Sequence, residues 1–167
     1  MIEVYTSYFY QIRNMDAGCL AFSTALGDPL WFHEGTRDKS YKFIDKHGRI
    51  NGLRAEPFVP RFNANLKNPC KGPEDCNQFK LPWYCEFLEE YYKLLSKLDP
   101  HNIEQRFRRV GQEWLEFLEE DIPLTYILLV HEAPTNPCSE RIMLQKWLKE
   151  NNMGGKEWSK EIGRAHV

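Results

Sequence analysis

The sequence lacks a strong excess of charge of either sign. Its 22 basic and 24 acidic side chains give a formal net charge of −2 and an isoelectric point of about 6.2. Nucleic-acid-binding domains commonly carry a basic excess, so the overall charge does not indicate one. A local basic patch stays open, because Arg106, Arg108 and Arg109 lie within four residues.

Membrane-spanning and secretory segments are also not expected. No stretch approaches the roughly 20 consecutive apolar residues that a membrane-spanning helix requires. The start, MIEVYTSYFYQIRN, does not join a basic beginning to a long apolar stretch, so no signal peptide is expected. We therefore expect a cytosolic protein that does not associate with a membrane.

The chain does not have an even set of cysteines. Five cysteines in a cytosolic protein favour thiols or metal ligands over disulfides. Cys70, Cys76 and Cys85 are separated by five and eight residues, whereas zinc sites usually hold cysteines two to four residues apart. Zinc is the first candidate cofactor, an iron–sulfur cluster is the second, and loop thiols without a metal are the alternative. Candidate fourth ligands are His101, His131, Cys138 and Cys19.

What the chain does contain is enough apolar sequence for one core. Its 167 residues are 42% hydrophobic and 14% aromatic, which suits one globular domain. Apolar runs predict strands at 2–5, 19–24 and 124–130, and the last is apolar throughout, as in a strand buried in a parallel sheet. Residues 43–53 look like a hairpin that turns at His47-Gly48. Apolar residues at helical spacing predict helices at about 83–98, 100–120 and 139–151.

Strands followed by helices predict a three-layer, Rossmann-like α/β domain with a short, mainly parallel sheet. The domain is expected to cover residues 1–155, with an irregular cysteine-bearing insertion at about 62–83. Residues 156–167 are expected to form a C-terminal tail. In such sheets ligands bind beyond the carboxyl ends of the strands.

The stretch ILLVHEAPTNPCSERIMLQKWL, residues 127–148, leads from the late apolar run into the last predicted helix. A helix start offers free backbone N–H groups and a positive dipole end, and Arg141 adds a bidentate donor. The first hypothesis is therefore an anion site formed by Ser139, Arg141 and the helix N-terminus. The second is a nucleophilic Cys138, because the same surroundings favour the thiolate. The third is structural: Ser139 caps the helix, Cys138 is a small buried residue, and Arg141 pairs with a distant carboxylate.

Further polar side chains are expected at the same edge of the sheet. If the first and last strands are parallel, hydroxyl groups of the first strand lie there, and they either line a pocket for phosphate or sugar or only satisfy backbone groups. Arg54, in a proline-framed loop, either completes that pocket or is solvated. His131 and Glu132 can supply acid–base chemistry, although neighbours on a strand point to opposite faces. The hydroxyl-bearing residues are Thr6, Ser7 and Tyr8.

Three stretches of the chain resemble a known family. VYTSYF at residues 4–9 is similar to the first strand of the family called domain of unknown function 488, and FVP at 58–60 resembles its Leu-Ala-Pro element. LLVHEAPTNPCSERIMLQKWL resembles its closing signature, in which an apolar strand and a Glu precede Cys-His-Arg at a helix start. Here Cys138-Ser139-Glu140-Arg141 has one inserted residue and no histidine. The resemblance implies one α/β domain with a parallel sheet and a site at this turn.

These features predict a phosphorylated nucleotide-type or nucleic-acid ligand, because phosphate, sugar hydroxyls and aromatic stacking would all be served. One form of the hypothesis is a hydrolase or glycosidase that acts on a nucleotide or DNA base, for instance by cleaving an N-glycosidic bond. The alternative is a non-catalytic interaction module ordered by a metal on the cysteine loop. The predicted catalytic residues are Glu132, Cys138 and His131.

Overall fold

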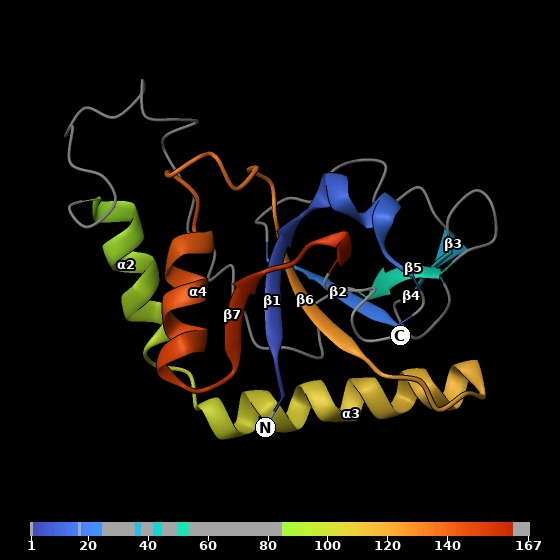
Figure 1. Ribbon diagram of the computed structural model, residues 1–167. Coiled ribbons are helices and arrows are strands. Elements are labelled where there is room, and N and C mark those ends of the chain that lie inside the picture. Colours follow the sequence, from blue (N-terminus) through green and yellow to red (C-terminus); the bar gives the residue numbers. More distant parts are fainter. Residues whose placement is uncertain are drawn as a thin grey trace.

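A short parallel sheet is the centre of the structure. The computed structural model of the chain describes residues 2–16, 18–24, 36–37, 42–44, 50–53 and 85–161. In this part of the chain the strand order of the parallel sheet is β2-β6-β1-β7 (Figure 1). The predicted Rossmann-like α/β class with a mainly parallel sheet is confirmed. The strands are β1 (Val4–Tyr8), β2 (Cys19–Ser23), β6 (Thr125–Val130) and β7 (Gly154–Glu157).

The remaining elements flank this sheet. A 3-10 helix, η1 (Phe9–Asn14), follows β1 directly. A small antiparallel sheet has the order β3-β4-β5, and its β5 lies close to β2. The antiparallel β4–β5 pair agrees with the predicted hairpin, whose turn lies outside the described residues. The bounds are α2 (Glu86–Leu95), α3 (Pro100–Leu118), α4 (Arg141–Glu150), β3 (Thr36–Arg37), β4 (Lys42–Ile44) and β5 (Ile50–Leu53).

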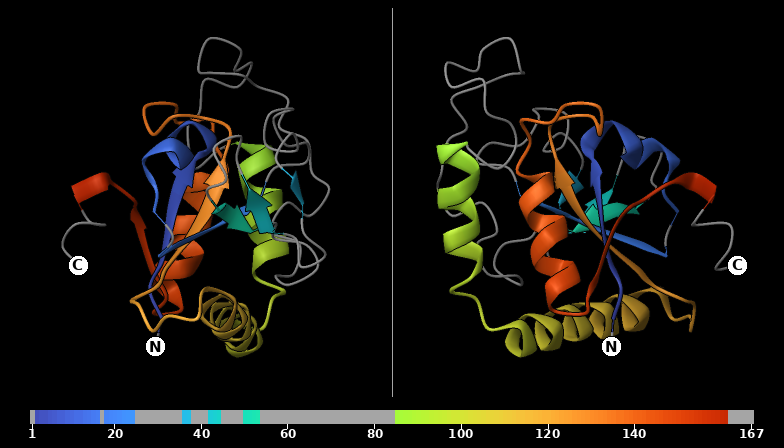
Figure 2. Two further views of the ribbon diagram at one scale, coloured as in Figure 1. Left: turned by 90° about the vertical axis from the view of Figure 1, so that its right-hand side faces the viewer. Right: turned by 60° about the vertical axis from the view of Figure 1, so that its left-hand side comes forward.

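The crossovers between strands decide which element covers which face. The chain leaves β1 toward β2 and leaves β6 toward β7, which are opposite directions across the sheet. Right-handed crossovers then place η1 and α4 on opposite faces. Accordingly, Phe9 and Ile12 of η1 pack with Tyr5 and Ile127, whereas α2, α3 and α4 pack on the other face. Figure 2 shows these layers from two further sides.

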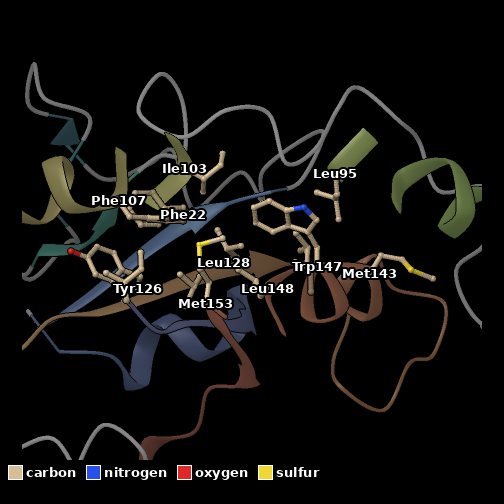
Figure 3. Packing of buried hydrophobic residues seen from close by; sticks show 14 of the residues in the cluster. Phe22, Leu95, Ile103, Phe107, Tyr126, Leu128, Met143, Trp147, Leu148 and Met153 are labelled. Carbon is tan, nitrogen blue, oxygen red and sulfur yellow. The ribbon is translucent and has the colours of Figure 1, made fainter. Parts of the chain in front are cut away.

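Helix α3 lies across the amino ends of the strands (Figure 1). Asp99 caps it by accepting from the His101 N–H at 3.0 Å, and Pro100 is its first residue, as predicted. The Phe107 ring is fully buried and meets the rings of Phe22 and Tyr126, each at 5.4 Å between centroids. These aromatic contacts join the helix to β2 and β6 in the core shown in Figure 3.

The C-terminal part of the sheet differs from the prediction. Residues 154–157 form β7, an edge strand beside β1, so the predicted domain boundary at residue 155 and the tail from residue 156 are corrected. A Cβ on Gly154 would lie 2.9 Å from the Val4 carbonyl oxygen, and Gly154 has φ +91°, so glycine permits this close pairing. Trp158, next in the chain, is buried at 4% exposure.

Helix α4 ends at Glu150, one residue before the predicted end at 151. Asn152 adopts a left-handed conformation with φ 57°. Its N–H donates to the Lys149 carbonyl at 3.2 Å, and the Met153 N–H donates to the Leu148 carbonyl at 2.8 Å. This pair of bonds is a Schellman motif, in which the left-handed Asn152 stops the helix.

The predicted insertion at about 62–83 lies outside the described residues. Among the helices of the described residues, none is long and apolar enough to span a membrane.

Candidate functional site at the carboxyl edge of the sheet

The topology places a switch point between β1 and β6. The two strands are parallel neighbours, with Tyr8 opposite Val130, and the chain leaves them toward opposite faces. Such a switch point is where open α/β sheets bind ligands. We define the carboxyl-edge site as Tyr8, Glu132, Ser139, Glu140 and Arg141 with the residues that contact them.

The turn into α4 is built by local hydrogen bonds. The Cys138 N–H donates to Asn136 Oδ1 at 2.9 Å, and the Arg141 N–H donates to Ser139 Oγ at 3.1 Å. The N-cap residue is Glu140, and the Ser139 hydroxyl satisfies the first N–H of the helix, which is the structural role that one of the three hypotheses proposes. Cys138 is buried at 3% exposure, which fits the small buried residue of the same hypothesis better than a nucleophile open to substrate.

A network of polar side chains holds the Arg141 guanidinium in place. Its Nε donates to Glu157 Oε1 at 2.8 Å, and the same oxygen accepts from the Thr6 hydroxyl at 2.7 Å. The Gln145 amide donates to Thr6 Oγ1 at 2.8 Å. The predicted pairing of Arg141 with a distant carboxylate is thus found, and Glu157 is its partner. Burial is the main cause that raises the Glu157 pKa, while Thr6 and Arg141 act in the opposite direction.

The network leaves part of the guanidinium unused. Arg141 is 4% exposed, yet its Nη1 and Nη2 atoms have no hydrogen-bond partner. Glu157 Oε2 is also buried and without a partner. Buried polar groups are nearly always hydrogen-bonded, and the cost of leaving one unpaired is largest for charged groups. Nη1 and Nη2 therefore offer two parallel donors to a further acceptor.

Two carboxyl groups lie on the other side of the Ser139 hydroxyl. That hydroxyl donates to Glu132 Oε2 at 3.4 Å, which is a long hydrogen bond. Burial and the nearby Glu132 charge raise the pKa of Glu140 from 4.5 to about 7. Tyr91 of α2 lies within electrostatic range of Glu140, and its buried hydroxyl has no partner. Near neutral pH Glu140 can therefore hold a proton.

Aromatic rings form the rim of the site. The Tyr8 ring centroid lies 5.8 Å from Arg141 Cζ, and the Tyr8 and Tyr10 rings stack at 6.2 Å. Tyr10 is 55% exposed, and Arg13 lies over its ring at 3.7 Å. His131 lies beside the Phe9 ring at 5.0 Å, on the η1 side, whereas Glu132 meets Ser139. The two predicted acid–base residues are thus directed toward different neighbours, although both lie beyond the end of β6 at Val130.

The other predicted site residues do not join this group. Ser7 is fully buried and shares a face with Tyr5, opposite Thr6, and its hydroxyl has no partner. Cys85 immediately precedes α2. The described residues contain no group of three or more potential metal ligands. The predicted residues outside the described part of the chain are Arg54, Cys70 and Cys76.

Sequence reasoning missed Glu140, Gln145 and Glu157. Glu140 is the residue inserted into the Cys-His-Arg signature, so the insertion itself was a usable signal. Glu157 belongs to the edge strand that was predicted to be tail, and Gln145 follows Arg141 by one helical turn. Their roles depend on strand pairing, which local sequence does not reveal.

The chain was compared with protein-family models, with curated proteins and with solved structures, and none of them matches. Membership of the family called domain of unknown function 488 therefore stays a proposal based on the quoted stretches. The fold and the geometry of the carboxyl-edge site are the grounds for proposing a function.

Proposed function

We propose that the chain binds a phosphorylated nucleotide-type ligand, free or within a nucleic acid, at the carboxyl-edge site. The observation that carries this proposal is the pair of buried, unpartnered Nη atoms on Arg141. A guanidinium presents parallel donors that match two oxygens of a phosphate. Glu157 holds Nε at 2.8 Å, so the orientation of these donors is fixed before a ligand arrives.

The acidic neighbours favour a nucleotide over bare phosphate. Glu132 and Glu140 would repel a second negative charge, but carboxyl groups bind the hydroxyl and N–H donors of a sugar or base well. The raised pKa of Glu140 reduces the repulsion near neutral pH. The Tyr8 and Tyr10 rings at the rim supply apolar surface for a base.

Access to Arg141 requires a movement. Because the side chain is only 4% exposed, the groups that cover it must be displaced before a phosphate reaches Nη1 and Nη2. Tyr8 is half-buried beside the guanidinium, and rotation of its side chain opens a path. The proposal therefore includes a change in the Tyr8 environment on binding.

Calorimetric titration with adenosine monophosphate, adenosine and inorganic phosphate tests this function. We expect the monophosphate to bind, and both fragments to bind at least about tenfold more weakly. Arg141→Lys keeps the charge but removes the paired donors, so it should weaken monophosphate binding about tenfold or more. Arg108→Lys, on an exposed arginine that pairs with Glu104, is the matched control. Unchanged affinity in a folded Arg141→Lys variant would contradict the proposal.

A hydrolase that cleaves the N-glycosidic bond is the second candidate, and the raised pKa of Glu140 next to a second carboxyl group favours it. Glu140, with a pKa of about 7, would donate its proton to the departing base, while Glu132 takes a proton from the attacking water. Water and the N-glycoside are consumed, and the free base and the sugar are formed. Release of free base from nucleotides, abolished by Glu140→Gln and by Glu132→Gln, is the expected result. No release by the unmodified chain would leave binding as the function.

A further inference from the structure

A hollow lies on α3, far from the carboxyl-edge site. Its volume is about 470 Å³, and among the described residues its wall comes from the first turns of the helix. Helix α3 crosses the amino ends of the strands, whereas the carboxyl-edge site is at their opposite ends (Figure 1). The donor-bearing residues of this α3 hollow are His101, Asn102, Gln105, Arg106 and Arg109.

The arginines of α3 differ in whether they pair with a carboxylate. Arg108 pairs with Glu104 at 3.1 Å and does not line the α3 hollow. Arg106 donates from Nε to Asn102 Oδ1 at 2.9 Å. Within the described part of the chain, neither Arg106 nor Arg109 has a carboxylate partner. The α3 hollow thus contains two guanidinium groups whose charge is not neutralised.

The one carboxylate on the described wall is already engaged. Asp99 caps α3 by accepting the His101 N–H at 3.0 Å. The charged side chains of the α3 hollow are two arginines and one aspartate, so the hollow has a local positive charge. The whole chain has a formal net charge of −2. Such a local excess attracts anions even when the whole molecule does not.

We propose that the α3 hollow binds a pair of adjacent phosphate groups. Arg106 and Arg109 are three residues apart on one helix, so their Cβ atoms lie roughly 5–6 Å apart and the two guanidinium groups can each hold one phosphate. Asn102 and Gln105 add donors for the further oxygens that a phosphate has and a carboxylate lacks. Both a free diphosphate and successive phosphates of a single nucleic-acid strand carry this chemistry.

Pyrophosphate is the first probe, measured by amide NMR titration of the full chain. We expect shifts at residues 101–110 and an affinity that falls at least about tenfold in Arg106→Ala/Arg109→Ala. Arg108→Ala is the matched control, because that arginine lies on the same helix but already has a partner, and it should change the affinity less than about twofold. If the alanine variant does not fold, Arg106→Gln/Arg109→Gln keeps the stem of each side chain and replaces it in the titration.

A mixed-sequence single-stranded DNA of 12 nucleotides is the second probe. If it binds, the salt dependence of log Kd should weaken by about 1.4 in the double variant, which corresponds to two lost phosphate contacts. Binding of both probes assigns the site to a nucleic-acid strand, and binding of pyrophosphate alone assigns it to a diphosphate ligand. The Arg141→Lys variant should keep the NMR shifts on α3, which separates this site from the carboxyl-edge site. Absence of pyrophosphate shifts on α3, or an equal loss in Arg108→Ala, would overturn the inference.

Discussion

The two ends of the parallel sheet are made from different side chains. At the amino ends, α3 covers the strands with large apolar groups such as Phe107 and Trp114, both fully buried. At the carboxyl ends, the buried groups include Ser139 and Arg141, and several of their neighbours have polar atoms without partners. The apolar side chains at the amino ends stabilise the fold when they are buried. The polar and charged side chains at the carboxyl ends cost free energy when they are buried without partners.

This difference indicates which end of the sheet stabilises the fold and which end is used for function. A buried polar group without a partner lowers stability, so its presence in a fold is expected where a ligand or a chemical step uses it. Substitutions in the apolar core at the amino end should therefore change stability, whereas substitutions at the carboxyl end should change ligand binding as well as stability.

Removal of the Phe107 ring should have the largest effect on stability. Phe107→Ala deletes a fully buried ring between Phe22 and Tyr126 and should lower the free energy of unfolding by about 3–5 kcal/mol. Urea denaturation measures the change. Gln112→Ala, on the exposed side of the same helix, should stay within about 0.5 kcal/mol of the unchanged chain. A loss below about 1 kcal/mol in Phe107→Ala would show that α3 does not anchor the core.

Removal of one partner of the buried ion pair between Arg141 and Glu157 should lower stability, whereas removal of both should not. Arg141→Met leaves the Glu157 carboxylate without its cation and should cost about 3 kcal/mol. Arg141→Met/Glu157→Met removes both charges. The double variant should be at least as stable as the unchanged chain, with an equal or higher Tm. The same double variant should not bind a nucleotide. A double variant less stable than Arg141→Met would contradict the view that this pair is kept for binding.

Glu140 should make stability depend on pH near neutrality. Its pKa is about 7 in the folded chain and its ordinary value is 4.5, so the folded state keeps the proton longer than the unfolded state. The favourable contribution is complete below pH 4.5 and is lost as the pH rises through 7, by roughly 2–3 kcal/mol in total. Urea denaturation from pH 4.5 to 8 should show this fall, and Glu140→Gln should remove it. Glu113→Gln, on exposed α3 surface, should leave the fall in place.

Gly111 tests how closely α3 approaches the sheet. A Cβ at this position would overlap the Tyr126 hydroxyl and would lie 3.0 Å from Leu124 Cδ1. Gly111→Ala should therefore destabilise the chain by about 2 kcal/mol, although alanine is normally the better helix residue. Adding Tyr126→Phe removes the overlapping oxygen and should restore part of the loss. A more stable Gly111→Ala variant would mean that the helix lies farther from β6.

Local sequence patterns predict most of the fold. The apolar runs predict β1, β2 and β6, although β1 extends from Val4 to Tyr8 and not from residue 2 to 5. Asp99 and Pro100 mark the start of α3 because capping depends on neighbouring residues alone. β7 has the sequence GGKE, which contains no β-branched or aromatic residue, and it becomes a strand only by pairing with β1.

The carboxyl-edge site is predicted less completely, for the same reason. Ser139 and Arg141 follow from a strand that leads into a helix, and the alternative in which Arg141 pairs with a carboxylate is also correct. The partner, Glu157, is 16 residues away on an unpredicted strand. Ser7 follows Thr6 in the sequence, but successive side chains of a strand point to opposite faces of the sheet. Ser7 therefore lies on the face opposite Thr6.

A crystal structure of the chain with adenosine monophosphate tests the central claim most directly. We predict phosphate oxygens about 2.7–2.9 Å from Arg141 Nη1 and Nη2, with the Tyr8 side chain displaced from its present position. Ordered water on both nitrogens at a saturating concentration of the nucleotide, with the phosphate absent from the carboxyl-edge site, would contradict the account.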